Sequence, residues 1–369
     1  NKAAEDKIAE INANTNATAE EKAAAIEKVN ADKMKALTAI NDNSVTTKAA
    51  LDNAKTSGTT AISNDNPVVT KKNTAKAAID SALRAKEAAI DANNDLTTEE
   101  KNAAKADAQA KANAAKTAID NATTNVAVDS AQTAGTTSVS SVMPTAVAKP
   151  AAKKAIEDAL KAKVAQLDAR NDLTTEEKEA AKADAQARAT AAKNNIDTAT
   201  TNSTVDNAKT TGVADVESVN PQASQKKTDA KNAVDEALKA KEAEIDANND
   251  LTAEEKSKAK EDAKSKADVA KQAIDNATTN AAVEQAKNDG ATSISSVTPT
   301  PTAKPAAKQA IDDALKAKND AIDSNNDLTA EEKAKAKEDA KAKADAAKQA
   351  IDNATTNDAV TQAKNAGAT

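Results

Sequence analysis

The segment Leu96-Thr97-Thr98-Glu99-Glu100-Lys101 carries the start signal of a helix. The Thr97 hydroxyl is placed to accept from the backbone of Glu100, and the Glu100 carboxylate is placed to accept from the backbone of Thr97, which together form a capping box. The same pair recurs at Thr18/Glu21, Thr174/Glu177, Thr252/Glu255 and Thr329/Glu332. Five regularly spaced copies indicate a tandem array of one helical unit.

The five glycines of the chain follow the same period. They lie 77, 77, 78 and 77 residues apart, at Gly58, Gly135, Gly212, Gly290 and Gly367. Nine residues after each of the first four comes a proline, at Pro67, Pro144, Pro221 and Pro299. These positions predict five repeats, at residues 1–67, 68–144, 145–221, 222–299 and 300–369. The first helix of repeat 1 and the end of repeat 5 are expected to be truncated, as in an excerpt from a longer array.

Within the second repeat, the apolar spacing predicts two helices before the glycine. Ile79, Leu83 and Ile90 share one face of a first helix, which should stop near Asn93-Asn94-Asp95, where Asn tolerates a left-handed cap. The capping box then begins a second, alanine-rich helix from about Thr98 to Asn121. Alanine has the highest helix propensity and lets neighbouring helices approach closely.

A third helix is predicted to follow the string Ala-Thr-Thr-Asn at 122–125, whose Thr or Asn should cap it. Its apolar stripe consists of Val128, Ala131, Gly135, Val139 and Val142. The glycine has two interpretations: a close approach inside a continuous helix, or a left-handed cap that ends a short one. The unbroken stripe favours the continuous helix, while the neighbouring threonines leave the cap open.

Three amphipathic segments joined by short turns predict an all-α fold of tandem three-helix bundles. An odd number of helices places the two ends of a repeat at opposite ends of its bundle. The linkers are short, lack glycine and contain proline, which is typical of stiff spacers. The repeats are therefore expected to run end to end as an elongated rod of about 170 Å.

The amino-acid composition excludes most kinds of catalytic and binding site. The chain has no His, Cys, Trp, Tyr or Phe, so it lacks thiol nucleophiles, imidazole bases and aromatic stacking platforms. Its formal charge of −7 combines 51 basic with 58 acidic residues, a balance that argues against nucleic acid as a partner. No apolar run reaches the length needed to span a membrane.

Two acidic motifs need a choice between chemistry and structure. The segment Asp91-Ala92-Asn93-Asn94-Asp95 begins like a calcium loop, but Leu96 replaces the required glycine and Asn102 the bidentate glutamate. Glu99 and Glu100 resemble an acid–base pair, yet they stand beside a capping threonine in every repeat. We interpret both motifs as helix caps and expect no catalytic, cofactor-binding or metal-binding residue.

Two further motifs also have structural explanations. Lysines of the second helix are expected on a solvated face, at Lys101, Lys105, Lys111 and Lys116. Glycosylation sequons begin at helix ends, at Asn121, Asn276 and Asn353.

The capping box, the Ala-Thr-Thr-Asn turn and the glycine–proline spacing resemble a known repeat over essentially the whole chain. They are similar to the three-helix domain-of-unknown-function repeats of large Gram-positive cell-surface proteins, the class of the extracellular-matrix-binding-protein homologue. The resemblance implies a secreted, wall-anchored protein whose repeats form a stalk or take part in adhesion and biofilm.

Two functions remain open from the sequence. The first is a monomeric structural stalk that projects a distal adhesive domain. The alternative is a multivalent adhesin that binds host matrix, plasma proteins or like chains weakly at each repeat. Neither is an enzyme, and neither requires a cofactor, nucleic acid or membrane insertion. Anchoring to the cell wall would depend on other parts of the parent protein.

Overall fold

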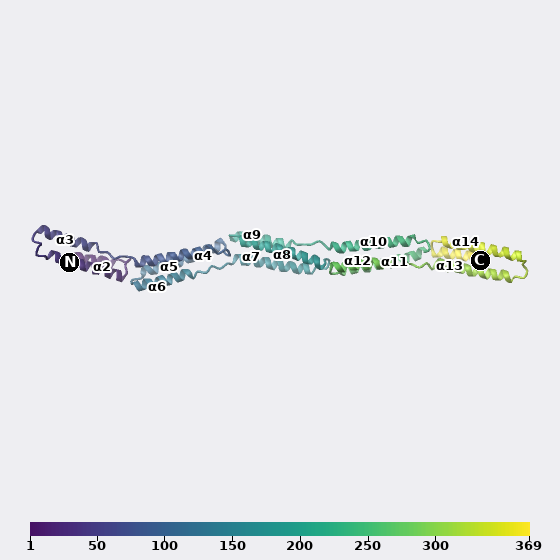
Figure 1. Cartoon of the computed structure of the whole chain (residues 1–369), viewed down its shortest axis with the longest axis horizontal. Helices are drawn as coiled ribbons and strands as arrows, with labels where there is room; N and C mark the ends of the chain where they lie inside the picture. The colour runs from purple at the N-terminus through teal and green to yellow at the C-terminus, as the bar shows by residue number, and fades with distance from the viewer. The chain divides into compact units, whose positions relative to one another are not determined.

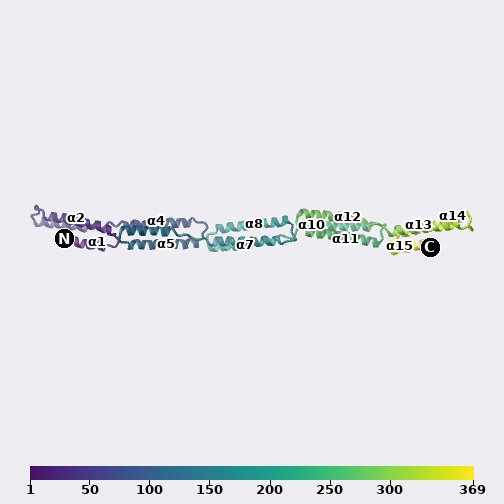
Figure 2. The same cartoon turned by 90° about the horizontal axis from the view of Figure 1, so that it is seen from below.

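The computed structural model describes residues 1–369 and contains fifteen α-helices and no strand. It separates into two units, Asn1–Leu160 with Ala187–Glu217, and Lys161–Gln186 with Ser218–Thr369. Three consecutive helices make up each repeat, and the repeats are numbered 1 to 5 below. In repeat 4 the three helices α10, α11 and α12 lie side by side in both views (Figures 1 and 2).

The helices fall into three classes by their place in the repeat. The first helices are α1 (Lys2–Ala13), α4 (Lys71–Asp91), α7 (Ala148–Asp168), α10 (Gln225–Ala247) and α13 (Ala303–Ser324). The second helices are α2 (Ala19–Ile40), α5 (Thr98–Asn121), α8 (Thr175–Thr198), α11 (Ala253–Asn276) and α14 (Ala330–Asn353). The third helices are α3 (Lys48–Ser63), α6 (Asn125–Ser140), α9 (Asn202–Glu217), α12 (Asn280–Ser295) and α15 (Asn357–Ala368). The all-α fold of repeated three-helix bundles is therefore confirmed.

The expected left-handed cap after the first helix is wrong. Helix α4 ends at Asp91, its C-cap Ala92 has φ −72°, and no residue of the chain has a positive φ. The Asn93 side chain instead accepts a hydrogen bond from the backbone N–H of Asp95 at 2.9 Å. Asparagine therefore serves here as a turn former through its side-chain oxygen.

The core of repeat 2 is built from few large side chains and many alanines. Ile79, Ile119, Val128 and Val139 are fully buried, one or two from each of the three helices. Alanines of α5 fill the space between them, at Ala104, Ala108, Ala112 and Ala115. Leu96, beside the capping box, is 3% exposed and packs into the same core cluster.

The third helix runs continuously through its glycine, which confirms the favoured interpretation and rules out the cap. A Cβ on Gly135 would lie 2.4 Å from the Cβ of Ala115 and 2.8 Å from Cδ1 of Ile79. Glycine is therefore required because the second and third helices approach too closely for any side chain.

Repeat 1 departs from the others at the end of its third helix. Asp65 stands where repeats 2, 3 and 4 have the buried valines Val142, Val219 and Val297. Its side chain has no exposed surface, and one carboxylate oxygen lies 2.7 Å from the Lys28 ammonium. A buried charge needs such a partner, because desolvation alone would disfavour it strongly.

Repeat 4 offers the cleanest test of the glycine contact. A Cβ on Gly290 would lie 2.4 Å from the Cβ of Ala270, but Val234 Cγ2 is 3.6 Å away and leaves room. Gly290→Ala should lower the free energy of local unfolding of repeat 4 by about 1–3 kcal/mol, because overpacking outweighs the gain in helix propensity. Native-state hydrogen exchange of the amides in α10, α11 and α12 measures this free energy of local unfolding. The swap Gly290→Ala with Ala270→Gly should recover most of the loss, whereas a swap as unstable as the single variant would contradict this account.

Candidate functional site

The site shared by the repeats is the junction between one repeat and the next, named below by the two repeats it joins. Each junction centres on the N-terminus of a second helix. The capping threonines there, Thr18, Thr97, Thr174 and Thr252, have no exposed surface. Junctions 1/2 and 2/3 lie within the first unit and junctions 3/4 and 4/5 within the second.

The capping box forms at every second helix. At α5, the Thr97 N–H donates to Glu100 Oε2 at 2.9 Å, and the Glu100 N–H donates to Thr97 Oγ1 at 3.3 Å. The same two bonds occur at α2, α8, α11 and α14. This prediction is confirmed for all five repeats.

The second oxygen of the capping glutamate reaches into the next repeat. Glu100 Oε1 accepts the backbone N–H groups of Val147 at 2.8 Å and Ala148 at 3.0 Å, at the start of α7. Glu21 takes the same pair from Thr70 and Lys71, and Glu255 from Thr302 and Ala303. One carboxylate therefore caps two helices that belong to consecutive repeats.

These hydrogen bonds favour the ionised carboxylate. Burial alone would raise the pKa of Glu255, but the bonds from Thr252, Ala303 and Thr302 outweigh it and lower the pKa to about 2. The pKa values of Glu21 and Glu100 are lowered in the same way, against the effect of burial. The charge also complements the positive ends of both helices.

The preceding glutamate holds the third helix of the next repeat. Glu99 Oε2 accepts the N–H of Asn202 at 3.0 Å, and the Thr98 N–H donates to the Thr200 carbonyl at 2.8 Å. Equivalent glutamate bonds join Glu20 to Asn125, Glu176 to Asn280 and Glu254 to Asn357. Equivalent backbone bonds join Ala19 to Thr123, Thr175 to Thr278 and Ala253 to Thr355. Both glutamates at the start of the second helix thus cap backbone N–H groups, which is the structural role expected for them.

A buried lysine completes each junction. Lys149 is 4% exposed, and its ammonium donates to the carbonyls of Asn94 at 2.8 Å and Asp197 at 2.7 Å. Asn94 belongs to the turn of the preceding repeat, while Asp197 lies in the last turn of α8. Carbonyls at a helix end lack internal partners and attract a cation. The equivalent lysines are Lys72, Lys227 and Lys304, each bonded to two such carbonyls.

Sequence reasoning missed these four lysines, although a signal exists. They recur at intervals of 77, 78 and 77 residues, in step with the glycines, and each precedes a buried alanine by three residues. The lysines expected on a solvated face are in part engaged as well. Lys105 pairs with Asp91 at 2.6 Å and Lys116 with Asp80, so that both join the second helix to the first.

Junction 3/4 differs from the other three. Its interval is one residue longer, and Ser224 caps α10 by accepting the Lys227 N–H at 3.2 Å. Glu177 Oε1 there accepts the Ser224 hydroxyl at 2.9 Å. Arg170 supports the turn through Asp172 at 2.6 Å and the Pro221 carbonyl at 3.2 Å. Helix α10 is therefore capped by its own serine.

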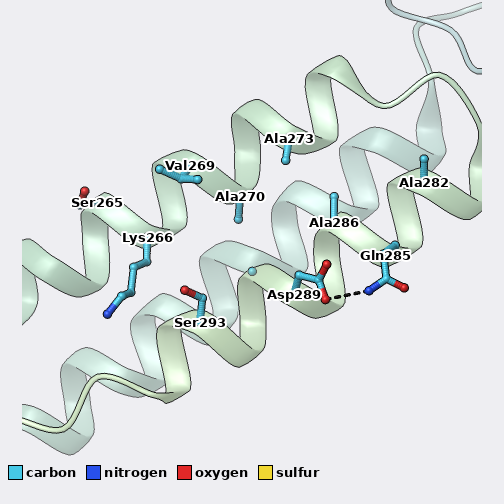
Figure 3. Close-up of a pocket in the computed structure, with 11 residues that line it drawn as sticks. Ser265, Lys266, Val269, Ala270, Ala273, Ala282, Gln285, Ala286, Asp289 and Ser293 are labelled. Carbon is cyan, nitrogen blue, oxygen red and sulfur yellow. Dashed lines mark hydrogen bonds between the residues drawn. The ribbon is translucent and has the colours of Figure 1, made fainter.

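A shallow apolar groove of about 470 Å³ lies in repeat 4 between α11 and α12. Figure 3 shows Val269 and Ala270 on one helix beside Ala286 on the other, with Asp289 bonded to Gln285 on the rim. Val269 is 63% exposed. The groove follows from the close helix approach at Gly290, where small side chains leave the surface hollow.

Comparison with known proteins identifies the repeat. Five segments match the family described as Domain of Unknown Function (DUF1542), at residues 1–70, 71–147, 148–224, 226–302 and 303–369. No solved structure matches the chain. None of the helices combines the length and apolar character needed to cross a membrane.

Curated relatives are large proteins of Staphylococcus aureus. Extracellular matrix-binding protein EbhA (strain Newman) is 34% identical over 207 residues, which are 56% of this chain and 6% of that protein. Extracellular matrix-binding protein ebh (strain NCTC 8325 / PS 47) is 34% identical over the same length and share of this chain, which is 2% of that protein. The chain therefore spans a small part of these relatives, and the resemblance stated from the sequence is confirmed.

The buried lysine should stabilise the junction more than any exposed lysine does. Lys227→Met leaves the carbonyls of Asn171 and Asp275 without their cation, at a cost of about 1–3 kcal/mol. Amide exchange of Thr175 and Asn280, whose N–H groups cross junction 3/4, should then accelerate about 5- to 150-fold. The matched control is Lys239→Met, which replaces an exposed lysine of the same helix. Equal exchange rates in the two variants would show that the lysine does not hold the junction.

Acid should loosen the carboxylate-capped junctions. The folded pKa of Glu255 lies below its ordinary value of 4.5, so its contribution is complete above pH 4.5 and is lost as the pH falls toward about 2. The chain has no cysteine, so spin labels at Lys239→Cys and Lys316→Cys report on junction 4/5 alone. The distribution of distances between the two labels, measured by double electron–electron resonance, should be narrow at pH 7 and broad at pH 2.

Two controls separate the junction from the bundles. Labels at Lys316→Cys and Lys341→Cys, both within repeat 5, should keep their distribution in acid if the bundle survives. Glu255→Gln should broaden the distance distribution across junction 4/5 already at pH 7. Glu177→Gln, measured with labels placed across junction 3/4, should broaden the distance distribution less, because Ser224 caps α10. Broadening of equal size at both junctions would argue against the double-capping role.

Proposed function

Because this chain belongs to the DUF1542 family, we propose that its repeats form a stiff stalk in a bacterial cell-surface protein and hold an adhesive domain away from the wall. Its relatives are named extracellular matrix-binding proteins, which supports an extracellular location. Anchoring would be supplied by other parts of the parent protein. The proposal assigns the chain no enzymatic activity.

The observation that carries this proposal is the repeated junction. A lysine, two glutamates and a backbone N–H of fixed position join each repeat to the next at two places: the start of the first helix and the start of the third. Because the two places lie on different helices of the next repeat, bonds at both oppose bending and twisting between repeats. A stalk needs that resistance, whereas a string of independent domains would be joined by flexible linkers.

The linkers and the helix number support the rod that the stalk requires. Pro150 and Pro305 stand within the first turn of α7 and α13, where the fixed φ of proline suits a helix start. The repeat boundaries at residues 67, 144, 221 and 299, and the end-to-end order of the bundles, remain predictions and form part of this proposal.

Small-angle scattering from the full chain tests the stalk. An extended rod of about 170 Å should have a radius of gyration near ~50 Å, against ~20 Å for a globule of this length. The value should stay the same between low and physiological salt, because the junction bonds are buried. A radius near that of a globule would overturn the stalk.

A second function is favoured by the names of the relatives together with the groove beside Val269. In it, the repeats bind matrix proteins directly, and the groove of repeat 4 contributes an apolar contact. Saturable capture of a plasma or matrix protein by the folded chain, lost in Val269→Ser, would assign adhesion to the repeats themselves. If the folded chain captures no such protein, the stalk remains the proposed function.

A further inference from the structure

Junction 3/4 contains one residue more than the other three junctions. Its lysine, Lys227, follows the proline at the end of the preceding repeat by six residues, whereas the other junction lysines follow theirs by five. The additional residue lies in the segment between Pro221 and Lys227, where α10 begins. Ser224 directly precedes this helix, and its hydroxyl accepts the Lys227 N–H at 3.2 Å. Helix α10 thus obtains its N-cap from its own repeat.

The other first helices obtain this acceptor from the preceding repeat. Thr70 and Thr302 precede α4 and α13, but neither side chain makes a capping bond to its own helix. Val147 precedes α7 and has no hydroxyl. The backbone N–H groups at these three helix starts bond instead to the capping-box glutamate of the preceding repeat. If that repeat unfolds, the helix start loses its acceptor.

We infer that junction 3/4 is a boundary that limits the spread of local unfolding along the array. In a tandem array each repeat draws part of its stability from its neighbours. Where a first helix is capped from outside, unfolding of the preceding repeat removes the cap and weakens the next repeat. The Ser224 hydroxyl also donates to Glu177, but loss of that partner leaves its oxygen able to accept the Lys227 N–H. The coupling of stability between repeats 3 and 4 is therefore weaker than that between repeats 2 and 3.

Other bonds across these two junctions are alike. Lys149 and Lys227 each bind two backbone carbonyls, one on either side of their junction. At both junctions a glutamate of the preceding repeat also accepts an asparagine N–H from the third helix of the next repeat. The first-helix cap therefore differs between junctions at which these contacts are the same. The inference concerns how unfolding spreads, so it would stand even if the stalk proposal failed.

The test opens repeat 2 or repeat 3 of the full chain by matched substitutions. Ala108 in α5 and Ala185 in α8 have no exposed surface, and both lie in the sequence Lys-Ala-Asp-Ala-Gln-Ala. Ala108→Pro and Ala185→Pro each remove a bond from the middle of the second helix and clash with its preceding turn, so each opens its own repeat. Faster amide exchange of Ile119 and Ile196, respectively, measures that opening.

The response of the next repeat is the measurement that decides. Ile156 in α7 and Val234 in α10 are fully buried and report on repeats 3 and 4. Ala108→Pro should accelerate amide exchange of Ile156 about fivefold more than Ala185→Pro accelerates that of Val234, which is the effect of one helix cap. Equal accelerations would overturn the inference.

Two further variants test whether the serine is the cause. In the chain with repeat 3 opened, Ser224→Ala should accelerate exchange of Val234 about fivefold, because the cap of α10 persists there until its hydroxyl is removed. In the chain with repeat 2 opened, Val147→Ala is the matched control. It should change exchange of Ile156 by less than about twofold, because Val147 offers no side-chain cap to lose. Effects of equal size for the two substitutions would also overturn the inference.

Discussion

The carboxylate of the capping-box glutamate is the interaction on which the array depends. Backbone N–H groups at a helix start have no partners within the helix, and each needs an acceptor. Glu100 provides one oxygen to its own helix and the other to the first helix of the next repeat. The local signal that starts a helix is thereby also the bond that joins two repeats. Because the carboxylate is ionised at neutral pH, the joint is strongest under the conditions in which an exposed surface protein would work.

The buried lysine and the glycine show how a chain without aromatic residues still makes defined contacts. A core of alanines supplies little apolar surface per residue, so the helices must approach closely to exclude water. Gly135 permits that approach inside a repeat, since any Cβ there would collide with Ala115. Lys149 uses its long stem to reach the junction and places its charge on two carbonyls. Backbone groups, rather than large side chains, therefore carry most of the specificity.

Much of the fold was predictable because each signal is local and repeated. The capping box at Thr97 placed the start of α5, and the apolar stripe through Gly135 indicated a continuous third helix. The junction was less accessible. Glu100 accepts a hydrogen bond from Val147, which lies 47 residues later in the chain. This contact depends on how two consecutive bundles pack, and no local sequence pattern indicates that packing. Lys149 shows the same period as the glycines, yet a lysine near a helix start is read by default as solvated. Asp65 escaped notice because its role appears only when repeat 1 is aligned with the valines of the others.

The lysine, the two glutamates and the crossing backbone N–H of each junction come from fixed positions in their repeats, and the same positions serve at all four junctions. Recombination between two repeats in register would therefore delete or duplicate a whole period and leave every remaining joint intact. A crossover out of register would separate a lysine from its carbonyls or a glutamate from its second helix. A change of repeat number in whole periods therefore requires no new kind of contact between repeats.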